Sequence, residues 1–206
     1  MRPDRIPLFP LNVVLLPGVD LPLHIFEPRY RQMVKKCLEE KSEFGMLLST
    51  PDGIARVGCT AEILELVKRY DDGRMDILTV GRVPFRVVEL YKEQPLLEGE
   101  VDYLEDRETQ VNASVRRQLV ELYETCHTLI FEDYPKNLDD ESQGELSYLV
   151  TGTLPMELLW KQQILELRTE ASRQVQLVAY LREWAPHLQK VGVMRQRAGG
   201  NGQSLN

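Results

Sequence analysis

The stretch LPLHIFEPRY, residues 21–30, decides how the first half of the chain is interpreted. Within seven positions it places an imidazole, a carboxylate, a guanidinium and a phenol, on His24, Glu27, Arg29 and Tyr30. Side chains of these types perform acid–base catalysis in many enzymes. The stretch is therefore either an active site or a structural joint, and the pattern around it has to distinguish the two.

The structural interpretation is that a strand becomes a helix within this stretch. In its first part, Leu, Leu and Ile alternate with other residues, as in an extended segment. Pro28 suits the first turn of a helix, and it keeps Glu27 in the extended conformation that a cap position requires. The four polar groups would then point in diverging directions. We favour this interpretation, and a small hydrolase that uses the four polar groups is the alternative hypothesis.

Short apolar runs separated by turn residues indicate strands in most of the first half. The first run, residues 6–18, contains three prolines, which indicates a strand at an edge or barrel rim rather than a central strand. From residue 28, apolar residues at i, i+3, i+4, i+7 and i+8 predict a helix. Further strands are expected at 44–49, 57–69, 74–81, 83–91 and 97–103, the last with an acidic face toward solvent.

After residue 108 the apolar residues recur with the period of a helix. Trp160 and Trp184 are expected to lie in the core of the helical part. The helix signals in chain order are an apolar stripe from Val111 to Ile130, a capping box at Ser142 and Glu145, Pro155 in a first turn, and Thr169 as the cap of residues 170–188.

Strands in the first half and helices in the second half define an α+β fold class. The strands are numerous and short, which is typical of a small barrel or sandwich. We expect a β-rich subdomain over residues 1–108 and an all-helical subdomain over 109–190. The polar, Gly-rich residues 191–206 are expected to form a flexible tail.

The charge of the chain limits its partners. It has 32 acidic and 25 basic residues, a net charge of −7 and a sequence pI of about 5.1. Phosphate backbones and anionic lipids repel such a chain unless basic residues cluster, and the sequence has no such cluster. No apolar run is long enough to span a membrane. We therefore expect no nucleic-acid partner, no membrane association and a cytoplasmic location.

Motifs for cofactor or metal chemistry are missing from the sequence. It contains no phosphate-binding P-loop, no G-x-G-x-x-G, no G-x-S-x-G and no H-E-x-x-H. Its three cysteines are widely spaced, which argues against disulfides and a zinc site. Cys126 and His127 are adjacent, but neighbouring helix positions point about 100° apart. Cys37 and Cys126 lie on apolar stripes and are expected to be buried, unreactive thiols. No cofactor and no metal are expected.

A long N-terminal segment resembles a known family. The segment IPLFPLNVVLLPGVDLPLHIFEPRYRQMV closely resembles the opening of the Lon protease N-terminal domain, the LON substrate-binding domain. It is most similar to the stand-alone bacterial version, in which P-L-H-I-F-E-P-R-Y is a hallmark. Further matches are FGMLLS, VGCTAEILEL and DGRMDILTVGRVPFRV, and the resemblance extends from about Ile6 to Leu188.

The resemblance implies a PUA-like pseudo-barrel followed by a helical bundle. In full-length Lon proteases this domain precedes ATPase and peptidase modules, and we expect a chain that lacks both and is not an enzyme. The implied function is the binding of unfolded or apolar polypeptide segments, or docking on a protease or chaperone partner. A regulatory or scaffold subunit is a third hypothesis. The candidate partner contacts are Phe9, Phe26, Glu27, Arg29 and Tyr30.

Overall fold

A computed structural model describes residues 2–92, 95–135 and 145–200 of the chain, with side chains as far as residue 190. Within these ranges there are six strands and five helices. The strands form one mixed sheet, and the predicted α+β class is confirmed. The chain divides into two compact units, one of Met1–Arg107 with Pro155–Arg168, the other of Glu108–Leu154 with Thr169–Asn206.

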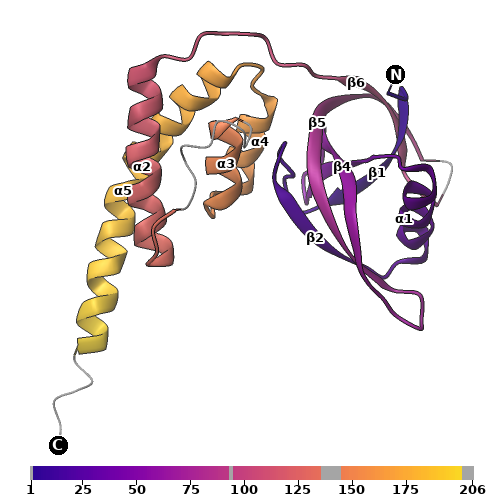
Figure 1. Ribbon diagram of the computed structural model, residues 1–206, viewed down its shortest axis with the longest axis horizontal. Helices are drawn as coiled ribbons and strands as arrows, with labels where there is room; N and C mark the ends of the chain where they lie inside the picture. Colours follow the sequence, from indigo (N-terminus) through magenta and orange to yellow (C-terminus); the bar gives the residue numbers. More distant parts are fainter. Residues whose placement is uncertain (1, 93–94, 136–144, 201–206) are drawn as a thin grey trace, which may run out of the picture. The chain divides into compact units, whose positions relative to one another are not determined.

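The sheet of the first unit curls into a closed ring of strands (Figure 1). Its order is β2-β5-β4-β3-β1-β6, and a further pairing between β5 and β6 closes the ring. β2 lies against the first half of β5, and β6 against the second half. The strands are β1 (Arg5–Leu11), β2 (Asp20–Ile25), β3 (Phe44–Thr50), β4 (Gly53–Arg69), β5 (Met75–Tyr91) and β6 (Glu98–Tyr103).

The first strand is expected at an edge or barrel rim, and the strand order places it between β3 and β6 rather than at a free edge. Arg5–Pro7 pairs antiparallel with β6, whereas Leu8–Leu11 pairs parallel with β3. Each half of β1 therefore pairs with a neighbouring strand on one side only. A proline, which has no backbone N–H to donate, can be accommodated on the side without a partner. The strands expected separately at 74–81 and 83–91 are the single long strand β5.

The inside of the ring is filled by aliphatic side chains around one aromatic ring. Phe85 is fully buried, and its ring lies against two glycines, Gly45 on β3 and Gly58 on β4. A Cβ atom at Gly45 would lie 2.6 Å from Phe85 Cζ, and one at Gly58 would lie 2.2 Å from the carbonyl oxygen of Met46. Glycine is required at both positions because the space of a side chain is already occupied. The other members of this cluster are Ile6, Leu8, Leu47, Val87 and Val101.

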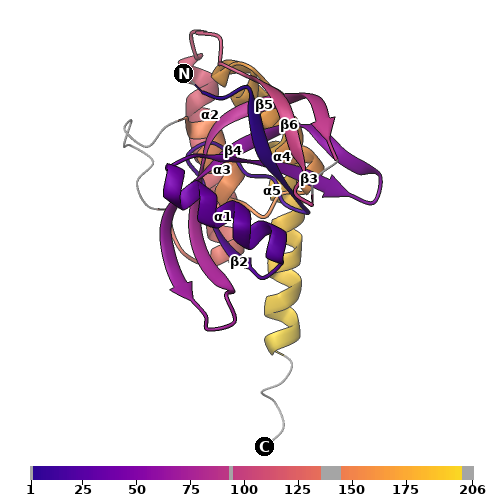
Figure 2. The ribbon, with the colours of Figure 1, turned by 90° about the vertical axis from the view of Figure 1, so that its right-hand side faces the viewer.

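Helix α1 (Pro28–Glu40) follows directly from β2, as LPLHIFEPRY predicts. Glu27 is the N-cap residue, with an extended backbone, and its carbonyl oxygen accepts the Arg31 N–H at 3.0 Å. The predicted stripe is confirmed, since Tyr30, Met33, Val34 and Cys37 are buried. Figure 2 shows α1 lying across the strands, with the β4–β5 hairpin extending past it.

One helix of the second half of the sequence belongs to the strand-rich unit. Helix α4 (Leu158–Glu166) packs on β4, where the Gln162 amide donates a hydrogen bond to the Val57 carbonyl at 3.0 Å. The subdomain limits expected from the sequence, 1–108 and 109–190, place α4 with the other helices, whereas the contacts of the structure place it in the strand-rich unit. Pro155 precedes α4 rather than lying in its first turn, because the helix begins only at Leu158.

The second unit consists of three described helices, α2 (Ala113–Phe131), α3 (Leu146–Thr153) and α5 (Glu170–Gly200). Thr169 caps α5 as predicted, with its hydroxyl accepting the Ser172 N–H at 3.1 Å. The predicted capping box is wrong at Glu145, which is itself the N-cap of α3, and Ser142 lies outside the described residues. The expected tail begins too early, because α5 continues to Gly200; residues 201–206 lie outside the described part.

A buried arginine joins α3 to α5. Arg173 has no solvent exposure, and its guanidinium donates to Ser147 Oγ at 2.8 Å and to Glu170 Oε2 at 3.1 Å. It also pairs with Glu145 and lies 4.2 Å from the ring centroid of Tyr148. The buried charge is therefore compensated from several sides, as burial of a guanidinium demands.

The two tryptophans expected in the core, Trp160 and Trp184, are half-buried.

Candidate binding cleft

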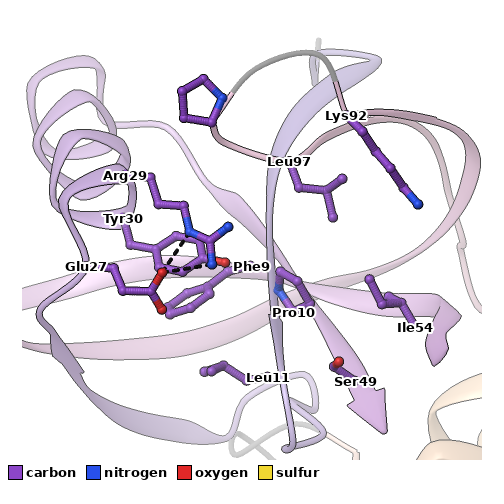
Figure 3. Close-up of a pocket in the computed structure, with 11 residues that line it drawn as sticks. Phe9, Pro10, Leu11, Glu27, Arg29, Tyr30, Ser49, Ile54, Lys92 and Leu97 are labelled. Carbon is purple, nitrogen blue, oxygen red and sulfur yellow. Dashed lines mark hydrogen bonds and ion pairs between the residues drawn. The ribbon is translucent and has the colours of Figure 1, made fainter. Parts of the chain in front are cut away.

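An open cleft of about 460 Å³ lies beside the N-terminal end of α1 (Figure 3). Four of the five candidate contacts from the sequence line it, and they come from β1 and from the β2–α1 joint. Strand β1 runs through the middle of the view, with Glu27, Arg29 and Tyr30 on one side of it. The lining residues are Phe9, Pro10, Leu11, Glu27, Arg29, Tyr30, Ser49, Ile54, Lys92, Pro95 and Leu97.

The aromatic residues of the cleft form its floor rather than its rim. Phe9 is 6% exposed and Tyr30 is 5% exposed, and their ring centroids are 4.0 Å apart. Phe9 also approaches Phe44, at 6.2 Å between centroids. Burial raises the pKa of Tyr30, the neighbouring Arg29 charge opposes this shift, and the phenol is neutral at neutral pH. Most of the surface of both rings thus stabilises the packing of α1 on β1.

Two of the three charged residues of the cleft, Glu27 and Arg29, neutralise each other, and Lys92 is the third. The Arg29 guanidinium donates from Nε and Nη2 to the same Glu27 oxygen, at 2.8 Å in both cases. Its Cζ also lies 4.5 Å from the ring centroid of Tyr30, within the range of a cation–π contact. Both side chains of the ion pair are well exposed, at 44% and 39%. The pair therefore forms a polar edge of the cleft whose charges are satisfied within the chain.

The opposite wall of the cleft comes from two hairpins that the sequence did not associate with this site. Ser49 and Ile54 lie on the β3–β4 hairpin, and Lys92 and Leu97 lie on the connection from β5 to β6 (Figure 3). Ile54 is 38% exposed, so its side chain is available at the rim. An alternating pattern marks Leu97 as an inward residue, but no sequence signal places it opposite Tyr30.

His24 lies outside this cleft, and the catalytic alternative fails on geometry. Its Nδ1 atom is 2.5 Å from Asp76 Oδ1, and the Tyr70 hydroxyl donates to Asp76 Oδ2 at 2.7 Å. These hydrogen bonds, that of His24 first, lower the pKa of the Asp76 carboxyl. His24 is thus bound to β5, while Glu27, Arg29 and Tyr30 line the cleft. The four groups do not converge, because strand and helix direct them apart.

Phe26, the fifth candidate contact, also lies outside the cleft. It is 61% exposed, and its ring centroid is 6.1 Å from that of His24. Among the candidates it is the most accessible apolar side chain, since Phe9 and Tyr30 are nearly covered. A partner contact by Phe26 remains a prediction, separate from the cleft.

The predicted burial of Cys37 and Cys126 is confirmed, and Cys59, for which no such prediction was made, is buried as well. Cys37, Cys59 and Cys126 are all buried and free. Burial raises the pKa of each thiol, to about 11 for Cys126. The His127 ring nitrogen Nδ1 lies 3.0 Å from the Asp133 carbonyl oxygen.

Within the described part of the chain, no group of three or more His, Cys, Asp or Glu side chains is arranged to hold a metal ion. None of the helices described there is long and apolar enough to cross a membrane.

The fold is that of the N-terminal domains of Lon proteases. A Lon N-terminal domain protein from Xanthomonas campestris matches with a TM-score of 0.65 and 25% identity, over 85% of this chain and 98% of the other. The N-terminal domain of the Mycobacterium avium complex Lon protease matches with a TM-score of 0.63 and 16% identity, over 86% of this chain and 98% of the other. At the second identity, the likeness concerns the fold alone.

The chain belongs to the family of the ATP-dependent protease La (LON) substrate-binding domain, whose model matches residues 5–183. Curated relatives include the Lon protease of Parabacteroides distasonis, 33% identical over 50% of this chain. The Lon protease of Cytophaga hutchinsonii is 24% identical over 83% of it. The chain spans 14% and 23% of the length of these two relatives, so the similarity concerns one part of each.

Proposed function

We propose that the chain binds polypeptide segments destined for proteolysis, or docks on a protease or chaperone partner, without catalysing a reaction itself. The observation that supports this most strongly is its membership of a substrate-binding family over residues 5–183. The proposal includes the cytoplasmic location and the independence of cofactors expected from the sequence. A binding role needs accessible apolar surface rather than converging catalytic groups.

The cleft beside α1 is the proposed contact surface. Its volume of about 460 Å³ is that of a site for a few side chains. Its floor is formed by buried aromatic rings, and its far wall combines the apolar Ile54 and Leu97 with the polar Ser49 and Lys92. An apolar side chain of a bound segment would lose its contact with water between Ile54, Leu97 and the Tyr30 ring. Burying a side chain of the size of Leu or Phe contributes about 1.5–3 kcal/mol. The Glu27–Arg29 pair at the edge provides hydrogen-bonding groups for the backbone of such a segment.

The test is a binding titration without ATP. A fluorescein-labelled, uncharged peptide rich in Leu and Phe is titrated with the protein, and its fluorescence anisotropy is measured. Ile54→Glu places a charge on the rim and is expected to weaken binding about tenfold, which corresponds to about 1.4 kcal/mol. The matched control is Val88→Glu, because Val88 is an exposed β-branched residue on β5 that does not line the cleft.

Two results would contradict the proposal. The first is a peptide that does not bind the unmodified protein at any concentration where the protein stays monodisperse. The second is an equal loss of affinity in Ile54→Glu and Val88→Glu, because that result would indicate general surface association. Far-ultraviolet circular dichroism of both variants shows whether their folds are intact.

A further inference from the structure

A second open cleft, of about 340 Å³, lies between α1 and the turn that joins β4 to β5. It is basic, although the chain as a whole is acidic. Three of its seven lining residues carry a positive charge and none carries a negative charge. Its lining residues are Pro28, Arg31, Gln32, Lys35, Arg69, Gly73 and Met75.

Arg31 is held in this cleft by a neutral acceptor. Its Nη1 atom donates to the backbone carbonyl oxygen of Asp72 at 2.6 Å. The Asp72 carboxylate itself is engaged by Arg74, with Arg74 Nε at 2.7 Å and the Arg74 backbone N–H at 3.1 Å. The backbone hydrogen bond is the main reason that the pKa of Asp72 is lowered. Arg31 is therefore held by a backbone carbonyl rather than by an ion pair, although its charge also helps to lower the pKa of Asp72.

The lack of a side chain at Gly73 leaves space for the Arg31 guanidinium. Its φ angle is +85°, which side chains disfavour, and a Cβ atom there would lie 2.7 Å from Arg31 Nη1. The Arg31 guanidinium can therefore lie directly against the backbone of the turn.

The two other cations also lack strong partners. Lys35 Nζ is 3.9 Å from Glu39 Oε1, at the limit of an ion pair, and both side chains are mostly exposed. Such a surface pair contributes little. Arg69, near the end of β4, forms no ion pair with any carboxylate of the described residues. Arg31 and Arg69 thus form no ion pair with a carboxylate of the described residues, and Lys35 forms only a weak one.

Four other arginines of the same unit differ in this respect. A carboxylate oxygen lies within 2.5–2.8 Å of the guanidinium in each of four ion pairs. These pairs are Arg5–Glu98, Arg29–Glu27, Arg74–Asp72 and Arg82–Glu62. With 32 acidic residues for 25 basic ones, carboxylates are in excess. A cleft that gathers three cations without them is therefore suited to an anion from outside.

We propose that this basic cleft binds clustered Asp or Glu side chains of a polypeptide. This inference rests on the proposed function, because it assigns a second contact for the same kind of ligand. The planar guanidinium of arginine matches a carboxylate in two parallel hydrogen bonds, and the lysine adds a flexible charge. The cleft volume of about 340 Å³ lies within the usual range of ligand sites and leaves room for a carboxylate side chain.

A nucleic acid fits the observations less well than an acidic peptide. A nucleic acid requires cations that follow its backbone over several phosphates. Here the cations are confined to one cleft, with Glu39 and Asp72 beside it, on a chain of net charge −7. A short cluster of carboxylates places its charge within the cleft, whereas a long polyanion extends into the acidic surroundings.

The test uses fluorescein-labelled hexaglutamate, with labelled hexalysine and a short labelled oligothymidylate as comparison probes, at low salt. Hexaglutamate is expected to bind, and its affinity is expected to fall as salt is added. Lys35→Glu and Arg69→Glu are each expected to weaken binding about tenfold. Lys36→Glu is the matched control, because Lys36 is an exposed neighbour on α1 that does not line the cleft and the substitution changes the net charge equally.

Several outcomes would overturn this inference. If hexaglutamate does not bind while the uncharged apolar peptide does, the basic cleft is not a peptide site, and the proposed function stands. If neither peptide binds, both proposals fail. If oligothymidylate binds with the same dependence on Lys35 and Arg69 and hexaglutamate does not, the ligand is a nucleic acid. If Lys36→Glu has the same effect as Lys35→Glu, binding reflects overall charge rather than the cleft.

Discussion

Two open clefts adjoin α1, and charge is arranged differently in each. In the first, Glu27 and Arg29 form an ion pair at 2.8 Å, above a floor of buried aromatic rings. In the second, Arg31, Lys35 and Arg69 converge without an acidic lining residue. Arg29 and Arg31 are two positions apart on one helix, so they face different neighbours. The comparison teaches that Arg29 is paired by a carboxylate of its own segment, whereas the position of Arg31 depends on a turn that is distant in the sequence.

The largest expected effect is on the floor of the first cleft. Tyr30→Ala removes a buried ring that packs on Phe9, and we expect it to lower the free energy of unfolding by about 3–5 kcal/mol. Gln32→Ala, on the exposed side of the same helix, is the control and should change it by less than about 0.5 kcal/mol. Urea denaturation followed by circular dichroism measures both. Equal losses would mean that the aromatic floor does not hold α1 in place.

A smaller effect is expected at alkaline pH, and it concerns the same buried face of α1. Burial raises the pKa of Tyr30 and of Cys37, so the folded state keeps both protons when the unfolded state has released them. The stability of the fold should therefore fall as the pH rises above the unfolded values, which are about 8.5 for Cys and about 10 for Tyr. Urea midpoints at increasing pH measure this loss.

The double variant Tyr30→Phe with Cys37→Ala lacks both groups and controls for this prediction. Its urea midpoint should decline less steeply with pH than that of the unmodified chain. The decline should not vanish, because burial also raises the pKa of Cys59 and Cys126. An identical pH dependence in both proteins would show that these two groups stay accessible in the folded state.

The smallest effect is expected at the ion pair of the first cleft. Glu27→Gln removes the charge that faces Arg29, but both side chains are well exposed. Exposed pairs contribute between 0 and about 1 kcal/mol, so the free energy of unfolding should change by no more than that. The same titration in urea measures it. A loss above about 2 kcal/mol would show that the pair stabilises the β2–α1 joint rather than serving as the edge of a cleft.

Much of the local structure could be predicted from the sequence. The alternation in LPLHIFEPRY and its Pro28 predict the strand, the cap and the start of α1, because these signals depend on neighbours within a few residues. The buried face of α1 follows from its period for the same reason. The stretch that resembled an active site is a joint between a strand and a helix, with His24 bound to Asp76 and Arg29 bound to Glu27.

The clefts themselves depend on contacts between distant residues, which no local pattern contains. Ile54 and Leu97 reach the first cleft through two hairpins, and Arg69 meets Arg31 at the second through the β4–β5 turn. The sequence therefore showed no basic cluster here, since Arg69 is far along the chain from Arg31 and Lys35. The membership of α4 in the strand-rich unit was missed in the same way, because it depends on the packing of Gln162 against β4.

The central claim is that the first cleft receives an apolar polypeptide segment. The most direct measurement is a map of backbone amide chemical-shift changes in the ¹⁵N-labelled protein as the uncharged peptide rich in Leu and Phe is added. The largest changes are expected at Leu11, Ile54 and Leu97, with little change at Val88. Changes confined to Val88 or to the helices α2, α3 and α5, with the cleft residues unaffected, would contradict the claim.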